Sequence, residues 1–246
     1  MSLHKAVPGQ VAAGHSIGML CAEWNIPFIP GDLNNASTFD FPILYATVPG
    51  ADGATILSGD PEVHQQKFVD AALALEAQGV KAITSNCGYM AAYQQAISEA
   101  VNIPVFMSSL LQTPLLLTML GSGAELGILV AGDSLRPELL RSSGLPHEHA
   151  TRVVVKGLAA YPHWNAAINQ ETGELDSCAI RDEVLDAACG LAREHPNVRA
   201  LLLECSDLPP YAHAVAEATG LPVFDWSGFI RWVHQACSPK TYPQAF

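Results

Sequence analysis

The stretch Gly79-Val-Lys-Ala-Ile-Thr-Ser-Asn-Cys-Gly-Tyr89 recurs without a gap as Asn197-Val-Arg-Ala-Leu-Leu-Leu-Glu-Cys-Ser-Asp207, and the match continues to Pro104-Val-Phe106 and Pro222-Val-Phe224. Ten of the 28 paired positions are identical, whereas average residue usage gives roughly two by chance. Both copies have the pattern of an apolar strand, a sharp turn, an amphipathic helix and a short strand. Cys87 aligns with Cys205, so each half of the chain offers one cysteine at the same structural place.

A second repeat supports a duplication, because Gly14-His-Ser-Ile-Gly-Met-Leu-Cys-Ala22 matches Gly123-Ala-Glu-Leu-Gly-Ile-Leu-Val-Ala131 at both glycines, a leucine and the final alanine. Short β-rich segments alternate with helical patterns along the chain, which is typical of βαβ units and a mainly parallel sheet. We therefore predict an α/β fold of two pseudo-symmetric domains, each with a mainly parallel sheet flanked by helices, and an active site in the cleft between them. The predicted division assigns residues 1–108 plus 222–246 to an N-terminal-type domain and residues 109–221 to a second α/β domain.

The patterning also predicts the individual elements. Strands are expected at residues 16–22, 42–48, 81–85, 105–106, 126–130, 152–155, 200–203 and 222–224. Helices are expected at residues 62–78, 89–100, 110–120, 135–142, 178–194, 208–218 and 226–236. Residues 24–41 and 161–176 are rich in Pro, Gly, Asn and Asp, and we expect both to form loops over the cleft, because functional residues concentrate on loops set on a rigid scaffold.

Charge and hydropathy exclude several classes of partner. The net charge is −12 and only 12 residues are Lys or Arg, so we expect no nucleic-acid partner, because phosphate backbones are bound by basic side chains. The longest apolar stretch, residues 110–120, is interrupted by polar residues and is far short of the roughly 20 residues that span a bilayer. The N-terminus lacks a basic region followed by an apolar segment, so we expect no secretory signal and a cytoplasmic protein.

The six cysteines are not expected to form a disulfide framework in a chain of this length without a signal peptide. No Cys-x-x-Cys pair or Cys/His set has zinc spacing, so we expect no metal. We also expect no pyridoxal phosphate, and no other cofactor, because none of the lysines lies in a Gly/Ser-rich phosphate-binding loop. These lysines are Lys5, Lys67, Lys81, Lys156 and Lys240.

Cys87 and Cys205 are the candidate catalytic residues. A cysteine at the carboxyl end of a parallel strand lies in the crevice where open α/β sheets bind ligands. The helix that follows should favour the thiolate and lower the thiol pKa from about 8.5 toward 7, so we expect these two thiols to react fastest with iodoacetamide. We interpret the other cysteines as small buried apolar residues; these are Cys21, Cys178, Cys189 and Cys237.

Two thiols on opposite sides of a bound acid fit stereoinversion next to a carboxylate. One thiolate removes the α-proton, and the other thiol returns a proton to the opposite face. Asn86 and Ser206 adjoin the cysteines and can donate hydrogen bonds to a carboxylate, although Ser206 also suits a helix N-cap. Glu23 and Asp32 follow the first strand and can reach the cleft, although both also suit ordinary turns.

These residues resemble the aspartate/glutamate/hydantoin racemase superfamily over nearly the whole chain. Within it, the sequence is similar to a branch that includes the dimethylsulfoniopropionate lyases. The resemblance implies a cofactor-independent enzyme of two pseudo-symmetric α/β domains with Cys87 and Cys205 as the acid/base pair, and it implies that Asn86, Gly88 and Ser206 contact the substrate carboxylate. The motifs that carry it are Pro30-Gly-Asp32, Asn86-Cys-Gly-Tyr89, Ser108-Ser-Leu-Leu-Gln112 and Leu203-Glu-Cys-Ser-Asp-Leu-Pro-Pro-Tyr211.

Three functions remain open at this point. Glutamate racemases have Cys-Asn-Thr and Cys-Thr-His at the two sites, whereas this chain has Cys87-Gly-Tyr89 and Cys205-Ser-Asp207, which disfavours glutamate as the substrate. The leading hypothesis is an amino-acid racemase-like enzyme acting on a small carboxylate. The alternatives are a β-elimination lyase, in which one cysteine removes the α-proton and a group leaves the β-carbon, and a non-catalytic protein that binds small acids. We expect a homo-oligomer.

Overall fold

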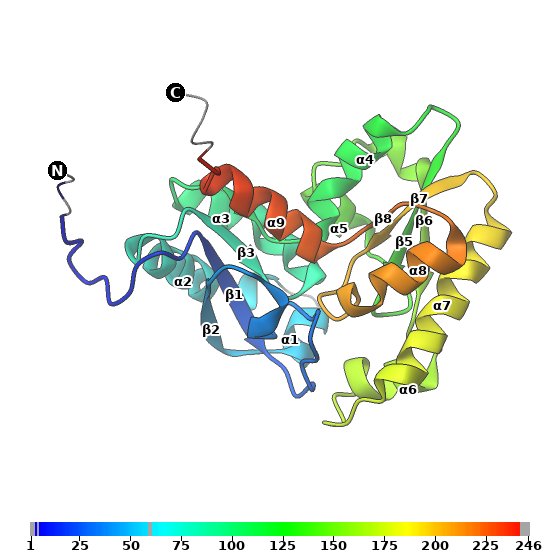
Figure 1. Ribbon diagram of the computed structural model, residues 1–246, viewed down its shortest axis with the longest axis horizontal. Coiled ribbons are helices and arrows are strands. Elements are labelled where there is room, and N and C mark those ends of the chain that lie inside the picture. Colours follow the sequence, from blue (N-terminus) through cyan, green and yellow to red (C-terminus); the bar gives the residue numbers. More distant parts are fainter. Residues whose placement is uncertain (1–2, 4, 59–60, 242–246) are drawn as a thin grey trace.

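Two four-stranded parallel sheets lie side by side in the computed structural model, which describes residues 3, 5–58 and 61–241 (Figure 1). The first sheet has the order β2-β1-β3-β4 and the second has the order β6-β5-β7-β8. The first sheet consists of β1 (Ile17–Glu23), β2 (Ile43–Asp52), β3 (Ala82–Ser85) and β4 (Val105–Phe106). The second consists of β5 (Glu125–Val130), β6 (Val153–Gly157), β7 (Val198–Leu203) and β8 (Val223–Phe224). The predicted fold class is thereby confirmed.

The sequence repeat is reproduced in the strand register. Ile83 pairs with Val105 between β3 and β4, and the equivalent Leu201 pairs with Val223 between β7 and β8. The central strands also pair in the same register. Gly18 of β1 pairs with Ile83, and the equivalent Gly127 of β5 pairs with Leu201. The two halves therefore present their strand ends in the same geometry.

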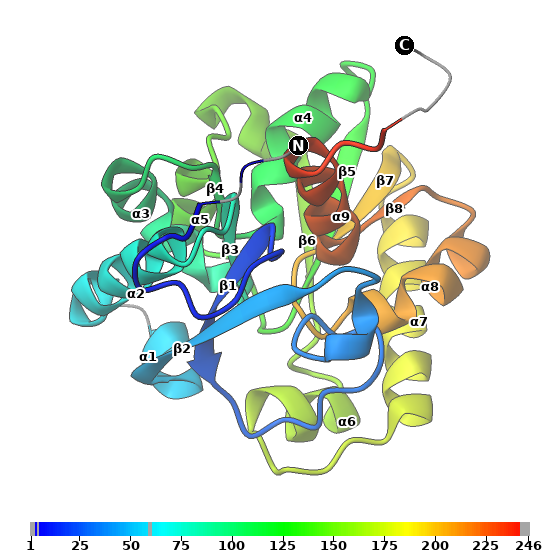
Figure 2. The same ribbon diagram turned by 60° about the vertical axis from the view of Figure 1, so that its left-hand side comes forward.

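Helices cover both faces of each sheet (Figure 2). They are α1 (Gly53–Ser58), α2 (Gln65–Ala77), α3 (Gln94–Ala100), α4 (Thr113–Met119), α5 (Pro137–Ser142), α6 (Pro162–Trp164), α7 (Ser177–Glu194), α8 (Ala212–Thr219) and α9 (Trp226–Cys237). Apolar side chains of α2 and α3 pack on one face of the first sheet. Those of α6, α7 and α8 pack on one face of the second sheet, and those of α4 and α5 pack on its other face.

The remaining face of the first sheet is covered by the last helix of the chain. Trp226, Phe229 and Ile230 of α9 pack with Ile17 and Met19 of β1. The helix α4, which follows the first sheet, packs in turn on the second sheet. The last helix of each half thus packs on the sheet of the other half. The strand β8 pairs with β7 of the second sheet, and the predicted division into domains stays a prediction.

Several elements differ from their predicted form. The expected helices at residues 89–100 and 208–218 begin as 3-10 turns, at Gly88–Tyr93 and Pro209–Tyr211. The second of these begins with Pro209 and Pro210, whose missing N–H groups cost no intrahelical hydrogen bond at the start of a helix. The expected loop at residues 161–176 begins with α6 and a π-helical turn over Asn165–Asn169. The helix α1 was not predicted.

Candidate active site

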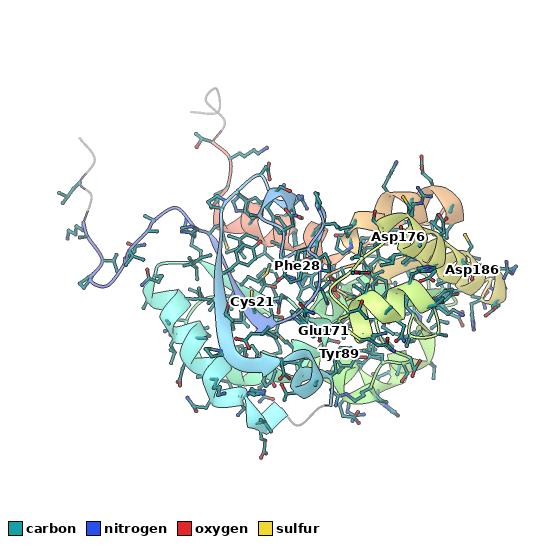
Figure 3. The ribbon with its side chains drawn as sticks, turned by 90° about the horizontal axis from the view of Figure 1, so that it is seen from below. Cys21, Phe28, Tyr89, Glu171, Asp176 and Asp186 are labelled. Atoms are coloured by element: carbon teal, nitrogen blue, oxygen red, sulfur yellow. The ribbon has the colours of Figure 1, made fainter. Side chains whose placement is uncertain are left out.

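A cavity lies between the two halves, at the carboxyl ends of the central strands. Its volume is about 30 Å³. Figure 3 places two of its lining residues, Phe28 and Tyr89, in the middle of the molecule. The other lining residues come from both halves and are Trp24, Ile26, Asn34, Leu57, Asn86, Cys87, Gly88, Ala131, Ile168, Asn169, Glu204, Cys205, Ser206 and Asp207.

Both candidate cysteines line this cavity, and they reach it in the same way. The residue before each cysteine still belongs to the ladder of its sheet, because Asn86 donates its N–H to Leu20 and Glu204 donates its N–H to Leu129. The chain then leaves the sheet at the cysteine. Cys87 and Cys205 are each only 8% exposed. The structure therefore brings the two thiols together, as the repeat predicts, and their catalytic roles stay predictions.

The expected lowering of the two thiol pKa values is wrong. The N–H groups of Tyr89 and Asp207 do point at the sulfur atoms of Cys87 and Cys205 and lower their pKa values. Burial has the larger effect and raises both, and the nearby carboxylates of Glu204 and Asp207 raise both further. Both cysteines are therefore protonated thiols at neutral pH in the unliganded protein.

Glu204 is the main residue that the sequence analysis left without a role. Glu204 is 1% exposed and lines the cavity together with both cysteines. Among the described residues, no group forms a hydrogen bond with its buried Oε1 atom. Burial, with a further contribution from the charge of Asp207, raises the pKa of Glu204 to about 8 although the Ala131 N–H opposes this. The signal in the sequence was its position, which is equivalent to that of Asn86 in the repeat.

Gly88 makes room for the Glu204 side chain. A Cβ atom at residue 88 would lie 1.7 Å from Glu204 Oε1 and 2.4 Å from its carboxyl carbon. No side chain fits there unless Glu204 moves. The predicted contact of Gly88 with substrate stays open, but the requirement for glycine has this separate structural cause.

A chain of hydrogen bonds runs from Cys205 into the first half. Asp207 Oδ2 accepts from the Cys205 thiol at 3.2 Å and from the Ser206 hydroxyl at 3.3 Å. Burial, then the charge and hydrogen bond of Asp207, raise the pKa of Asp32 to about 10. The Asn34 N–H and side-chain amide donate to Asp32 Oδ1 at 2.6 and 3.1 Å. Asp32 therefore keeps its proton at neutral pH.

The segment that carries Asp32 crosses to the second half. Gly31 has a φ of +102°, and a Cβ atom there would lie 2.9 Å from the Cα of Pro210, so glycine serves both the turn and the close approach. The N–H of Leu33 also donates to the carbonyl of Ser206 at 3.4 Å. These contacts hold the loop at residues 24–41 against the turn of the second cysteine.

The remaining predicted site residues divide into two groups. Asn86 lines the cavity, but its side chain is engaged by the protein, because its Oδ1 accepts from the Ala22 N–H and its Nδ2 donates to Asn34. Ser206 also lines the cavity and is bonded to Asp207. Glu23 ends β1 with an exposed side chain outside the residues that line the cavity.

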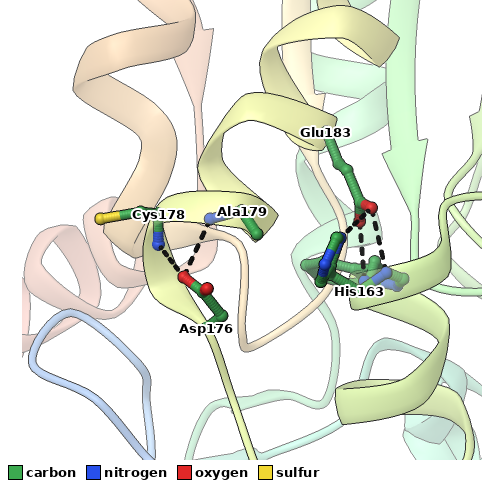
Figure 4. Close-up of polar contacts among 6 residues, drawn as sticks. His163, Asp176, Cys178, Ala179 and Glu183 are labelled. Atoms are coloured by element: carbon green, nitrogen blue, oxygen red, sulfur yellow. Dashed lines mark hydrogen bonds and ion pairs between the residues drawn. The ribbon is translucent and has the colours of Figure 1, made fainter.

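The two predicted cover segments meet over the cavity. Asn25 donates its N–H to Glu171 Oε2 at 2.7 Å and its side-chain amide to the Glu171 carbonyl at 2.9 Å. The second segment is also anchored to α7 (Figure 4). Glu183 accepts from His163 and Trp164, and Asp176 caps the first turn of α7.

The remaining sequence expectations concern metals, cofactors, membranes, location and oligomeric state. Within the described residues, no group of three His, Cys, Asp or Glu side chains is arranged to hold a metal ion, and the expectation of a cofactor-independent site stays a prediction. No helix in the described part of the chain is long and apolar enough to cross a membrane. The expectation about a secretory signal concerns in part residues 1, 2 and 4, which lie outside the described residues. The cytoplasmic location and the homo-oligomer stay predictions.

Solved structures share the fold of this chain, and their sequence identities of 14–17% support the fold alone. An unliganded arylmalonate decarboxylase matches with a TM-score of 0.56 and 17% identity over 92% of this chain and 94% of that chain. A glutamate racemase from Bacillus anthracis matches with a TM-score of 0.56 and 17% identity over 91% and 83% of the two chains. An allantoin racemase from Pseudomonas fluorescens matches with a TM-score of 0.54 and 14% identity over 89% of each chain.

Curated relatives are closer in sequence. No family model matches the chain. Dimethylsulfoniopropionate lyase 6 of Emiliania huxleyi is 33% identical over 87% of this chain, which spans only 58% of that protein. The dimethylsulfoniopropionate lyase of Durusdinium sp. clade D is 33% identical over 85% of this chain and 71% of its own length. The chain therefore belongs to the family of the dimethylsulfoniopropionate lyases.

Proposed function

We propose that this chain is a cofactor-independent lyase that removes the α-proton of a small carboxylate and expels a sulfonium group from its β-carbon. The names of its relatives suggest this substrate class, and dimethylsulfoniopropionate is the first candidate. One observation favours a lyase over a racemase: the two cysteines have equivalent positions in the repeat but different neighbours. Cys205 is bonded to a carboxylate two residues on, whereas Cys87 is followed at that position by Tyr89.

The cavity lining suits a hydrophobic cation. Trp24, Phe28 and Tyr89 supply aromatic rings, and Ile26, Leu57 and Ile168 supply aliphatic surface. Aromatic rings attract cations through their faces. A sulfonium group carries its charge among methyl groups and needs no hydrogen-bond acceptor, so it fits these walls better than an ammonium group does.

We assign the role of base to Cys87. Its sulfur receives the N–H groups of Tyr89 and Met90, both of which favour the thiolate. The charge of Asp207 raises the pKa of both thiols, but Asp207 is hydrogen-bonded to Cys205, so Cys205 is suited to remain a thiol. A bound cation close to Cys87 lowers the thiol pKa by charge attraction, which makes the base available when substrate is present.

The proposed reaction is a β-elimination. The Cys87 thiolate takes the α-proton, the C–H electron pair forms a carbon–carbon double bond, and the C–S bond breaks. The sulfide leaves with the C–S electron pair, so the positive charge of the sulfonium is discharged and an unsaturated carboxylate remains. The Cys87 thiol then returns its proton to solvent.

Racemisation is the second candidate, because the two thiols occupy equivalent positions at the ends of β3 and β7. It would require each cysteine to act as the base for one enantiomer. The pairing of Cys205 with Asp207 disfavours that equivalence.

One NMR experiment in deuterated water tests both candidates. The protein is incubated with dimethylsulfoniopropionate and, separately, with each enantiomer of aspartate and glutamate. The proposal expects dimethyl sulfide and acrylate from the first substrate and no inversion of the amino acids. Inversion with deuterium at the α-carbon, and no elimination, would favour the racemase. Neither exchange nor elimination with any of these compounds would contradict the proposal.

A further inference from the structure

Glu204 lines the cavity and has a carboxyl oxygen without a hydrogen-bond partner among the described residues. The side chain at the equivalent position of the first half is hydrogen-bonded to protein groups. The equivalent residue, Asn86, has its side chain engaged by Ala22 and Asn34. Glu204 Oε1 is buried and has no hydrogen-bond partner among the described residues. A buried polar atom without a partner is rare in proteins, and it is costly unless a ligand completes its bonding. The pseudo-symmetry of the fold therefore breaks at this atom.

The substrate carboxylate needs hydrogen-bond donors, and the described residues of the cavity lining offer no positively charged one. Among the described residues that line it, none is Lys or Arg. When the α-proton leaves, negative charge spreads onto the carboxylate oxygens, so a donor placed there stabilises the transition state more than the ground state. An ionised Glu204 could only accept hydrogen bonds, whereas a protonated Glu204 offers one O–H donor.

The surroundings of Glu204 keep it protonated. Its carboxyl group is buried, and the negative charge of Asp207 lies close enough to raise its pKa further. Gly88 provides the space that brings the carboxyl group against the turn of Cys87. The acid is thus held beside the thiol that we assign as the base.

We propose that Glu204 acts as a neutral carboxylic acid that donates its O–H to the substrate carboxylate and stabilises the enediolate formed by proton removal. This inference rests on the proposed function, since it assigns a group to the same reaction. Glu204 keeps its proton throughout. It is therefore a catalytic hydrogen-bond donor and does not take the α-proton.

The test compares the pH dependence of kcat/KM for dimethylsulfoniopropionate in the wild-type protein, E204Q and E204M. Wild-type kcat/KM should fall relative to that of E204Q above about pH 8, where Glu204 loses its donor. The E204Q variant keeps an N–H donor that does not titrate, so it should retain activity within about tenfold and lose this alkaline limb. The E204M variant keeps the volume without a donor, and its kcat should fall about 100-fold or more.

Glu183→Gln is the matched control. Glu183 is a largely buried carboxylate outside the cavity, bonded to His163 and Trp164. The E183Q variant should keep the wild-type alkaline limb. An alkaline limb that persists in E204Q would overturn the proposal. An inactive E204Q together with wild-type activity that rises through pH 8 would also overturn it, because Glu204 would then act as a base.

A binding measurement separates failure of this inference from failure of the proposed function. Propionate binding is followed by calorimetry across the same pH range. The inference expects propionate to bind more weakly to the wild-type protein above about pH 8 and to show no such loss in E204Q. If the wild-type protein turns over no substrate but shows this binding pattern, only the proposed function fails. If it turns over substrate without this pattern, the role of Glu204 fails. If E204M does not fold, the pH dependence of E204Q alone still tests the role of Glu204.

Discussion

The Cys205 thiol donates a hydrogen bond of 3.2 Å to the carboxylate of Asp207. The equivalent of Asp207 in the first half is Tyr89, whose hydroxyl instead donates to the carbonyl of Ser134. A duplicated fold thus carries one thiol that is hydrogen-bonded to a carboxylate, Cys205, and one thiol, Cys87, for which no such bond is seen among the described residues. This difference gives the two cysteines different acid/base chemistry within the same backbone geometry.

Replacing Asp207 by Asn should let the Cys205 thiolate form at lower pH. The charge of Asp207 raises the pKa of Cys205, and Asn removes that charge while keeping an acceptor for the thiol. The measurement is the ultraviolet absorbance of the thiolate during a pH titration, with C87S as the background. The D176N variant is the control, because Asp176 precedes Cys178 by two residues and lies outside the residues that line the cavity. An unchanged Cys205 titration in D207N would contradict this assignment.

C87S and C205S should each lose turnover while keeping the fold. Ser conserves the volume, but its alcohol is not ionised at working pH, so a loss of about 100- to 10,000-fold is expected in C87S, which lacks the assigned base, and a smaller loss in C205S. The two variants should differ in α-proton exchange in deuterated water: C87S loses it and C205S keeps part of it. Mirror-image exchange defects on two enantiomers would instead favour a racemase, and full turnover in either variant would exclude the two-cysteine site.

G88A should destabilise the protein through the clash with Glu204. A Cβ atom would lie 1.7 Å from Glu204 Oε1, and overpacking of this kind costs about 1–3 kcal/mol. Urea unfolding measures the change. The double variant G88A/E204A should recover much of the lost stability, because it removes the clashing atoms. G123A is the control, since a Cβ atom there meets nothing within 4 Å. Equal losses in G88A and the double variant would argue against this contact.

Iodoacetamide should label Cys178 first, in contrast to the expectation from sequence. Cys178 is exposed at the start of α7, whereas Cys87 and Cys205 are buried thiols with raised pKa values. Thiolate fraction and access together set the alkylation rate. Peptide mass mapping after short labelling identifies the site, and C178S should lose the fastest phase. Faster labelling of Cys87 than of Cys178 would contradict this prediction, because it would show that Cys87 is ionised despite the burial and the carboxylates that raise its pKa.

Stability should fall as the pH rises, because Glu204 and Asp32 hold protons in the folded state that the unfolded chain has released. Their pKa values are raised to about 8 and about 10, so the folded protein binds more protons than the unfolded chain between about pH 4 and these values. Each group contributes a slope of at most about 1.4 kcal/mol per pH unit. The E204Q variant should have a flatter curve of unfolding free energy between about pH 5 and 8.

Glu183 is the control for this measurement, because its pKa is shifted in the opposite direction to that of Glu204. Hydrogen bonds from the His163 and Trp164 N–H groups lower the pKa of Glu183 despite its burial. Glu183 therefore contributes stability that is lost as the pH falls through its folded-state pKa. The E183Q variant should change the acid side of the curve and leave the slope on the alkaline side intact. Identical slopes for E204Q and the wild-type protein would contradict the protonated state of Glu204.

The sequence by itself determined the fold class and the meeting of two cysteines. The repeat around Cys87 and Cys205 specifies a strand and the turn that ends it, and these are local features set by apolar pattern and turn residues. Equivalent strands then pair in the same register, as Ile83–Val105 and Leu201–Val223 do. The local sequence pattern was enough to predict these strands and turns, because both copies must bury the same apolar faces.

Only the tertiary structure decided the chemistry of the site. The pKa of Cys205 depends on burial and on Asp207 and Glu204, and that of Asp32 depends on Asp207, which is far away in the sequence. The exposure of Cys178 and the contact of Gly88 with Glu204 are likewise products of packing. Desolvation and charge interactions add up over every group that surrounds an atom, and those groups come from segments that only folding brings together.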